Sequence, residues 1–256
     1  MITYRLSYKA PANNTISIPI TGSKSETNRL LILKALFPNL TLKNGSISDD
    51  SKVLKKALQI KNGTVDIHHA GTAMRFLTAY FAFQEGCDVI LTGSSRMQER
   101  PIGILVDALR EMGAAISYVK KEGFPPLKIK GKKCKKNAIT IAANVSSQYI
   151  SALMLMGASL ENGLIISLDG KTTSIPYIKM TEALLKQVGI PCVFSENKIS
   201  TKPVSTVESR EIVVESDWSS ASYFYSIIAL SNDTSVTLTS YKKGSLQGDS
   251  ALATIY

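Results

Sequence analysis

The sequence is poor in cysteine and has no long apolar run, and both shortages narrow the class of protein. The cysteines Cys87, Cys134 and Cys192 are widely spaced and form neither a CxxC nor a CxxH pair. This pattern argues against a structural zinc site and a disulfide framework, and it is typical of a reducing compartment. No apolar stretch reaches membrane-spanning length, and residues 1–10 alternate polar and apolar side chains like a strand rather than a signal peptide. We therefore expect a soluble cytoplasmic protein without a membrane partner.

Histidine and acidic residues are also scarce. The histidines, His68 and His69, are adjacent, and because neighbouring side chains diverge the pair does not predict a metal site. There are 30 Lys and Arg residues against 20 Asp and Glu, and the net charge of +10 favours an anionic partner. Nucleic acid, a membrane surface and small phosphate or carboxylate substrates are all compatible with that charge.

Part of the positive charge is concentrated in the lysine-rich segment 128–136. We interpret this segment as a solvated strand–loop edge, because only Phe124 stands near it as an aromatic that could stack on a base. Aromatic–basic interleaving and known nucleic-acid reader motifs are missing from the chain. We therefore expect no nucleic-acid partner.

Two kinds of helix alternate along the chain, with short strand-like runs between them. Helices of the first kind open with small hydroxyl residues and are strongly apolar, and we expect them at Ser25–Phe37, Thr72–Phe83 and Ser146–Leu160. Helices of the second kind are amphipathic and are followed by glycine, and we expect them at Ser51–Ile60, Pro101–Met112 and Pro176–Val188. Strands are expected at Asp88–Thr92, Leu127–Lys130, Ala138–Ala142, Leu164–Leu168 and Glu211–Val214.

This alternation predicts three βαβ-containing units, at about residues 20–65, 66–140 and 141–215. A fourth unit begins at Asp217, which is expected to cap an apolar helix at Tyr223–Leu230. A strand at Val236–Leu238 and a helix at Ala251–Tyr256 follow. A chain that stops inside an amphipathic helix looks cut, and a genuine short C-terminal helix is the alternative. We therefore expect the front part of a longer α/β protein.

The stretch Thr21–Leu33 is the strongest candidate site. A Gly-Ser corner leads into an apolar helix with Lys24 and Arg29 near its N-terminus, so that free N–H groups, hydroxyls and two cations would converge on an anion such as phosphate. The spacing is not that of a P-loop. A Ser-capped helix that carries a surface Lys and Arg is the alternative.

Two further corners open helices of the same kind. His69–Arg75 contains Gly71, which lets backbone N–H groups approach a ligand, and Asn144–Gln148 places two hydroxyls and an amide at a helix start. Each corner alone has the composition of an ordinary N-cap. Because the corners occupy homologous positions in three units, we expect them to meet around a common axis as three anion-binding helix ends.

Two more segments add candidate ligands. Arg100 precedes the proline that starts a helix, and its guanidinium could pair bidentately with a carboxylate or a phosphate. A solvated loop is the alternative for this segment. Ser174 and Tyr177, at the start of another helix, could contribute a hydroxyl and an aromatic face.

Taken in order, these motifs resemble the 3-phosphoshikimate 1-carboxyvinyltransferase (EPSP synthase) family. The resemblance runs through the whole chain and rests on Gly22–Ser25 with Asn28-Arg29, Ala70–Arg75, Arg96-Met97 with Glu99–Gly103, Ser146–Gln148, Pro176–Ile178 and Ser220–Phe224. It implies two inverse-barrel domains, each of three repeated βαβαββ units around buried parallel helices. Residues 1–19 would be a strand segment of the second domain, 20–215 a complete three-unit substrate-binding domain, and 216–256 the start of the second domain.

The family transfers the enolpyruvyl group of phosphoenolpyruvate to the 5-hydroxyl of shikimate 3-phosphate and releases phosphate. The resemblance therefore implies two small anionic substrates, no metal, no cofactor and a monomeric full-length form. Carried over residue by residue, it assigns shikimate 3-phosphate to Lys24, Ser25, Arg29, Ser146, Ser147, Gln148, Ser174 and Tyr177. It assigns phosphoenolpyruvate to Lys24, His69, Gly71, Arg100 and Gln148, with Lys24 as the catalytic candidate.

The chain departs from the family pattern at several points. His69 stands where the motif usually has Asn, although a neutral imidazole can still donate one hydrogen bond. Phe76 replaces a frequent proline. The family's proton-transfer carboxylates belong to the other domain, beyond Tyr256, so this chain is expected to bind substrate without full activity.

Two alternatives to an EPSP synthase differ in what they require of the chain. The related enolpyruvyltransferase that acts on UDP-N-acetylglucosamine uses a cysteine in the loop before the Arg-Pro pair, and residues 93–101 contain none. A non-catalytic anion- or substrate-binding domain remains open for the chain as it stands.

Overall fold

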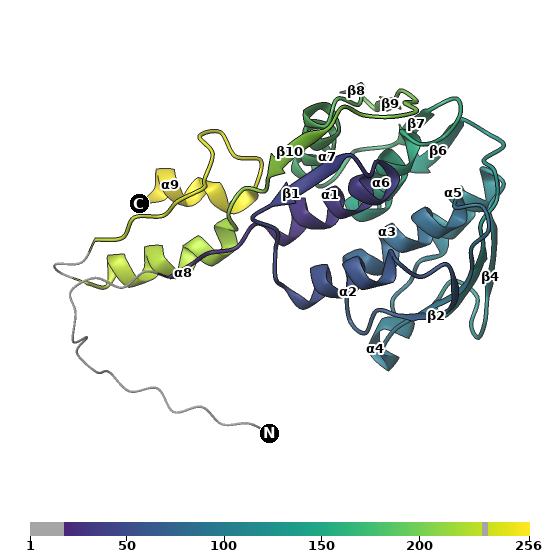
Figure 1. Ribbon diagram of the computed structural model, residues 1–256, viewed down its shortest axis with the longest axis horizontal. Helices are drawn as coiled ribbons and strands as arrows, with labels where there is room; N and C mark the ends of the chain where they lie inside the picture. Colours follow the sequence, from purple (N-terminus) through teal and green to yellow (C-terminus); the bar gives the residue numbers. More distant parts are fainter. Residues whose placement is uncertain (1–17, 232–234) are drawn as a thin grey trace.

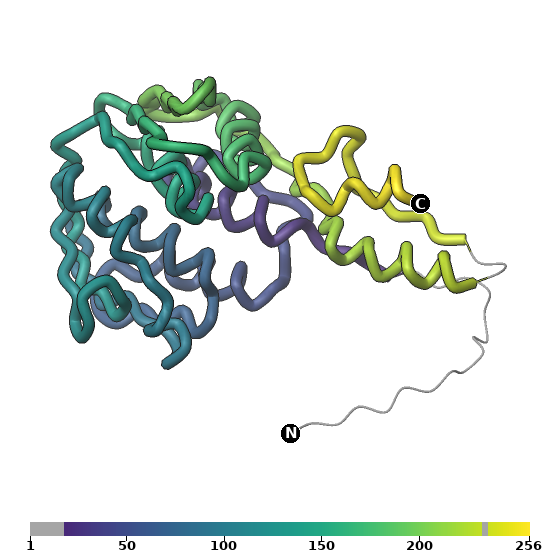
Figure 2. The backbone as a smooth tube through the Cα atoms, turned by 180° about the vertical axis from the view of Figure 1, so that it is seen from behind, coloured from purple at the N-terminus to yellow at the C-terminus, as the bar shows by residue number. Residues whose placement is uncertain are grey.

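The structure, a computed structural model, describes residues 18–231 and 235–256 (Figure 1). It has a large α/β body, residues 22–214, and a smaller extension formed by the described residues from 215 onward. Figure 2 shows from behind that the extension projects from one end of the body. Among the described residues no helix is long and apolar enough to cross a membrane.

Two successive units of the body repeat one order of elements. The first contains β2 (Asn62–Asp66), α3 (Gly71–Ala82), β3 (Asp88–Thr92), the short α4 (Ser95–Gln98), α5 (Gly103–Glu111), β4 (Ala115–Tyr118) and β5 (Leu127–Lys130). The second contains β6 (Ala138–Ala142), α6 (Ser147–Gly157), β7 (Leu164–Asp169), α7 (Ile175–Gln187), β8 (Cys192–Ser195) and β9 (Lys198–Thr201). Their four-stranded sheets have the equivalent orders β2-β3-β5-β4 and β6-β7-β9-β8, with one parallel and two antiparallel pairings each. The internal repeat expected from the sequence is therefore present.

The remaining unit differs. It consists of α1 (Lys24–Leu36), β1 (Leu40–Lys43) and α2 (Asp49–Ala57), and β1 pairs in parallel with β10 (Arg210–Val213). Its sheet has two strands among the described residues, one of them from the far end of the body. The expectation of a βαβ-containing unit at about residues 20–65 is therefore wrong, because β1 pairs with a strand about 170 residues away and β2 belongs to the sheet of the next unit.

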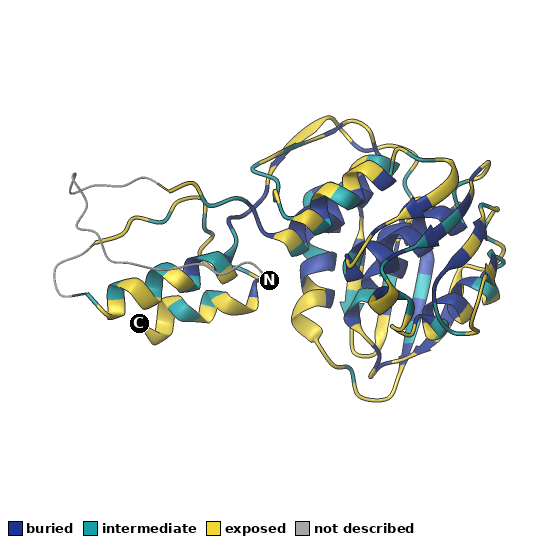
Figure 3. Ribbon diagram, turned by 90° about the horizontal axis from the view of Figure 1, so that it is seen from below, coloured by how far each residue is buried: buried dark blue, intermediate teal, exposed yellow. Residues whose placement is uncertain are grey.

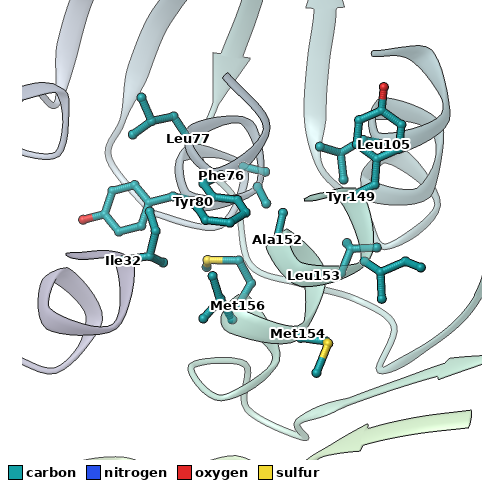
Figure 4. Packing of buried hydrophobic residues seen from close by; sticks show 14 of the residues in the cluster. Ile32, Phe76, Leu77, Tyr80, Leu105, Tyr149, Ala152, Leu153, Met154 and Met156 are labelled. Carbon is teal, nitrogen blue, oxygen red and sulfur yellow. The ribbon is translucent and has the colours of Figure 1, made fainter. Parts of the chain in front are cut away.

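The core lies between the first helices of the units. Helices α1, α3 and α6 pack against one another, and α3 and α6 are buried along nearly their whole length. Figure 4 shows Ile32 of α1, Tyr80 of α3 and Met156 of α6 within one apolar cluster. Helices that are apolar on all faces must be buried, which is why α3 and α6 occupy the centre, whereas α1 contributes the apolar side chains of its second half, such as Leu30 and Leu33.

Several expected boundaries need correction. Helix α5 begins at Gly103 rather than at Pro101, because the Pro101 carbonyl accepts a hydrogen bond from Tyr149 and the Ile102 N–H donates to Gly123. Val236–Leu238 is not in a strand, since no neighbouring strand among the described residues offers it a ladder. The strand expected at residues 1–10 lies outside the described residues.

The extension contains α8 (Trp218–Ala229), a 3₁₀ turn at Gly248–Ala251 and α9 (Leu252–Ile255). As expected, Asp217 caps its helix by accepting a hydrogen bond from the Ser220 N–H, although α8 begins five residues before Tyr223. The helix expected at Ala251–Tyr256 is divided between the 3₁₀ turn and α9. Figure 3 shows that α8 is a mixture of exposed and half-buried residues and that α9 is mostly exposed, in contrast to the body.

Body and extension meet where two chain segments cross. Gly22 forms an antiparallel bridge with Ser216, the Ser23 N–H donates to the Glu215 carbonyl at 2.8 Å, and the Asp217 N–H donates to the Thr21 carbonyl at 3.1 Å. A Cβ at Gly22 would collide with the carbonyl oxygen of Asn44, so only glycine fits this crossing. We call residues 21–23 with 214–217 the junction.

Candidate functional site

A cavity of about 610 Å³ opens where the body faces the extension. Its wall on the body comes from the start of α1, the turn before α2 and the start of α7, and its opposite wall comes from the start of α8 and residues 247–249. The lining residues are Thr21, Ser23, Lys24, Ser25, Ser46, Ile47, Ser48, Tyr177, Met180, Asp217, Ser219, Ser220, Gln247, Gly248 and Asp249.

Lys24 lies in the first turn of α1 with a half-exposed side chain, and its Nζ is 3.7 Å from Asp50 Oδ1. An exposed pair at this distance contributes little to stability, so the ammonium remains available to another anion. Ser23 forms no capping hydrogen bond through its side chain. The first-turn N–H groups of α1 therefore add their partial positive charge to that of Lys24 at the cavity wall.

Arg29 lies behind this wall rather than in it. The residue is 2 % exposed, and its guanidinium donates to Thr181 Oγ1 at 2.8 Å, to the Ser25 carbonyl at 2.9 Å and to Ser151 Oγ at 3.0 Å. Its Cζ is 5.8 Å from the centre of the Tyr177 ring. Burial lowers the pKa of Arg29 to about 10, so the side chain remains charged at neutral pH. Arg29 thus holds α1, α6 and α7 together and places a buried positive charge next to Ser25 and Tyr177.

The starts of α3 and α6 are joined directly. Gln148 donates from Nε2 to Thr72 Oγ1 at 3.3 Å, and both residues lie in the first turn of their helices. Since Arg29 and Ser151 link α1 to α6 one turn further in, the three helix N-termini converge. These hydrogen bonds bring the three helix starts together, as the repeated corners predict, and the binding of an anion there stays a prediction.

Arg100 and Gly71 are packed against each other beside that convergence. A Cβ built on Gly71 would lie 2.5 Å from Arg100 Nη1 and 3.3 Å from Arg75 Nη1, so the glycine makes room for two guanidinium groups. Arg75 donates to the Gly71 carbonyl at 3.0 Å, and its Nε is buried with no hydrogen-bond partner among the described residues. Burial is also the main reason that the pKa of Arg75 is lowered, and nearby Arg100 lowers it further.

The remaining sequence candidates are less closely tied to these groups. The Ser146 hydroxyl accepts a hydrogen bond from the Gln148 N–H at 3.4 Å and thus acts as an ordinary N-cap. Ser147 is buried in the first turn of α6. Ser174 precedes α7 with a left-handed backbone, φ 53°, and makes no capping hydrogen bond. His69 is exposed, and its ring lies 6.3 Å from that of His68.

The structure therefore brings the candidates together in two groups. Lys24, Ser25 and Tyr177 line the cavity with Arg29 behind them. Gly71, Arg100 and Gln148 lie around the starts of α3 and α6. No three His, Cys, Asp or Glu side chains within residues 18–231 and 235–256 form a group that could hold a metal ion.

Sequence reasoning missed the hydroxyl residues that position Arg29. Ser151 of the apolar helix α6 and Thr181 on the buried face of the amphipathic helix α7 are fully buried and hydrogen-bond to each other at 2.8 Å. A hydroxyl on the buried face of a helix requires a polar partner, and that requirement was the available signal. The wall formed by Ser46–Ser48 was also missed, although a Gly-Ser turn after a strand resembles the other corners.

Comparison with known proteins gives a consistent result. The profile of the family described as EPSP synthase (3-phosphoshikimate 1-carboxyvinyltransferase) matches residues 42–256. A 3-phosphoshikimate 1-carboxyvinyltransferase from Bacteroides fragilis strain YCH46 is 46% identical over 248 residues, which cover 96% of this chain and 60% of that protein. A pentafunctional AROM polypeptide from Scheffersomyces stipitis is 38% identical over 280 residues, which cover 95% of this chain and 18% of that protein.

Solved structures match as well. The EPSP synthase from Acinetobacter baumannii superimposes with a TM-score of 0.69 at 22% sequence identity, covering 81% of this chain and 52% of that one. At this identity the superposition supports the fold alone. The chain spans about 60% of the length of the Bacteroides relatives it matches.

Proposed function

The chain belongs to the EPSP synthase family, and from that premise we propose that its body binds shikimate 3-phosphate for the transfer of an enolpyruvyl group from phosphoenolpyruvate. The observation that carries the proposal is the convergence of three helix N-termini beside Lys24, Arg29 and Arg100. Such a site suits ligands that carry several negative charges, because partial and full positive charges act on them together.

In this proposal the residues that line the cavity bind shikimate 3-phosphate. Lys24 binds its anionic group, Ser25 and the flanking N–H groups donate to it, and Tyr177 covers one side of the ring. Arg29 contributes its charge from behind Ser25. Ser146, Ser147 and Ser174 are proposed as hydroxyl donors on the side of α6 and α7.

Phosphoenolpyruvate is proposed to bind at the starts of α3 and α6. Arg100, next to Gly71, pairs with one of its anionic groups, and Gln148 stands between the two substrates. Lys24 is proposed to contact both substrates, and His69 to donate a hydrogen bond at the edge of the site. The domain division at about residue 215 is part of the same proposal.

In the proposed reaction C3 of phosphoenolpyruvate accepts a proton, and the 5-hydroxyl oxygen of shikimate 3-phosphate attacks C2 while the hydroxyl gives up its own proton to a base. A tetrahedral intermediate forms, and loss of phosphate with the return of a proton from C3 gives the enolpyruvyl ether. The residues named above contribute alignment and charge stabilisation, which are large terms in catalysis. They include no carboxylate assigned to proton transfer, so we propose substrate binding without full turnover for these 256 residues.

Titration calorimetry tests the proposal. Shikimate 3-phosphate added to the 256-residue chain should release or absorb heat with a stoichiometry of about one, as a single preformed site requires. A parallel titration with RNA and DNA at several salt concentrations examines the polyanion alternative. Steeply salt-dependent nucleic-acid binding without any shikimate 3-phosphate binding would overturn the proposal.

A further inference from the structure

A buried carboxylate links the body to the outer part of the extension. Glu26 follows Ser25 in α1, is 4 % exposed, and accepts a hydrogen bond on Oε2 from the Glu215 N–H at 3.3 Å. Its other oxygen, Oε1, accepts from Gln247 Nε2 at 3.4 Å. Neither bond was expected from the sequence, since the partners lie 189 and 221 residues away.

Gln247 is fixed tightly within the extension. Its Nε2 also donates to the Ser216 carbonyl at 3.0 Å, and its Oε1 accepts from the Trp218 N–H at 3.0 Å. A movement of Gln247 therefore carries the start of α8 with it. The carboxylate of Glu215 is equally engaged, because it accepts from Trp218 Nε1 and the Lys242 N–H on one oxygen and from Ser245 Oγ on the other.

The hydrogen bond between Glu26 and Gln247 has no substitute elsewhere. Among the hydrogen bonds of the described residues, it is the only one that joins the body to the segment 240–256. Empty space lies on both sides of it. Gln247 lines the 610 Å³ cavity, whereas Glu26 and Glu215 line a second cavity of about 190 Å³ between α7 and residues 242–246. Packing alone therefore holds this part of the extension only weakly.

We propose that Glu26 is a positioning residue that sets the orientation of the extension over the body, and with it the distance between the two walls of the larger cavity. The carboxylate acts through Gln247, which carries the wall formed by residues 247–249, while its neighbours Lys24 and Ser25 form the opposite wall. A buried carboxylate is a costly way to add stability, and its best-supported use is to select one arrangement among several.

This role of Glu26 goes beyond the proposed function, because the distance between the two cavity walls can be measured without a substrate. Lys52 of α2 and Ala229 of α8 are exposed positions on the body and the extension. Spin labels on Lys52→Cys and Ala229→Cys report the distance between them. Cys134→Ser removes the partly exposed native thiol, and Cys87 and Cys192 are buried.

In this labelled background we expect a single narrow distance distribution by pulsed electron resonance. Glu26→Gln keeps the shape of the side chain but replaces one acceptor oxygen with an NH₂ group that faces a donor, so the narrow peak should be lost. Gln247→Ala removes the same bond from the other side and should have the same effect. Glu161→Gln, an exposed matched control, should leave the distribution unchanged.

Two accompanying measurements separate positioning from general stability. The thermal midpoint of the body, followed by circular dichroism, should stay close to that of the parent while the narrow peak is lost. Titration of the parent with shikimate 3-phosphate is a separate measurement that rests on the proposed function. If the parent does not bind shikimate 3-phosphate, only the proposed function is refuted. Distance distributions like that of the parent in both Glu26→Gln and Gln247→Ala would overturn the positioning role. If Glu26→Gln does not fold, the distance distribution of Gln247→Ala alone tests the role.

Discussion

Arg29 Nε donates a hydrogen bond to Thr181 Oγ1 at 2.8 Å and so joins α1 to α7 across 152 residues of sequence. With Ser151 and the Ser25 carbonyl as further acceptors, the guanidinium is both a structural tie and a charge behind the cavity wall. Substitutions at Arg29 should therefore affect stability and ligand binding together, whereas substitutions of Lys24 should affect binding alone.

Arg29→Lys tests the structural part of this dual role. A lysine ammonium cannot reproduce the planar fork that reaches three acceptors on two neighbouring helices and on α1 itself. We expect the free energy of unfolding to fall by about 2–3 kcal/mol, the scale of losing hydrogen bonds to a buried charged group. Urea denaturation measures this loss, and an unchanged midpoint would show that the buried contacts are dispensable.

Lys24→Ala tests the binding part. The Lys24 ammonium is half exposed and its pairing with Asp50 is long, so we expect the free energy of unfolding to change by less than about 1 kcal/mol. The affinity for shikimate 3-phosphate should fall by about 1–3 kcal/mol, as expected for the loss of a charge-assisted contact. Calorimetry measures the affinity. Lys52→Ala, an exposed lysine on α2, is the control and should bind like the parent.

Gly71→Ala tests the packing of Arg100. The added methyl group would overlap Arg100 Nη1, and because the guanidinium is the flexible end of a side chain it should move rather than unfold the helix. We expect phosphoenolpyruvate binding, measured by calorimetry in the presence of shikimate 3-phosphate, to weaken by about 1–2 kcal/mol. In Gly103→Ala the new methyl group meets only ordinary van der Waals contacts, so this control should bind normally.

Ser174→Gly should separate stability from binding by changing them in opposite directions. Its left-handed backbone, φ 53°, costs a residue with a side chain about 1 kcal/mol that glycine avoids. The variant should therefore be more resistant to urea but bind shikimate 3-phosphate less tightly, because the proposed hydroxyl is gone. Glu196 has the same φ in the turn between β8 and β9, and Glu196→Gly should raise stability without altering affinity.

Stability should depend on pH through Glu26. Burial raises the pKa of its carboxyl above the ordinary 4.5, the nearby Glu215 raises it further, and Lys242 opposes the shift. Because the folded pKa is the higher one, the stabilisation is fully present below pH 4.5 and is lost as the pH rises through the folded pKa.

The unfolding free energy of the parent relative to Glu26→Gln should therefore decline as the pH rises above 4.5. Urea denaturation of both proteins at a series of pH values measures this difference, and the same series on Glu161→Gln serves as the exposed control. A difference that stays constant across the series, or that grows with pH, would contradict the assignment of the shift to burial.

The sequence was a good guide to features that depend on neighbouring residues. The apolar helices were located within a few residues because their periodicity and small opening residues act locally: the starts expected at Thr72 and Ser146 each differ from the observed start by one residue. The repeated order of elements was visible because both later units carry the same Gly-terminated helix before a strand. The chemistry of the helix starts followed from these local patterns.

Features that depend on distant pairing were not predictable in this way. The pairing of β1 with β10 depends on two segments about 170 residues apart, and the strand expected at Val236–Leu238 finds no neighbour among the described residues. The burial of Arg29 could not be read from its sequence neighbours, because its acceptors Ser151 and Thr181 belong to other units. Glu26 was overlooked because its partners lie in the extension.

The bridge between Gly22 and Ser216 has an architectural consequence. Because Gly22, the first residue of the body, pairs with Ser216, two residues beyond the last residue of the body, the body has the topology of an insert within a host chain. Segments with adjacent ends can be excised or transplanted without stretching their interior. Thr21 and Asp217, which flank this bridge, are also joined by a hydrogen bond from the Asp217 N–H to the Thr21 carbonyl. A short loop between those two residues would join the flanking segments directly, and residues 22–216 could be expressed as a separate protein.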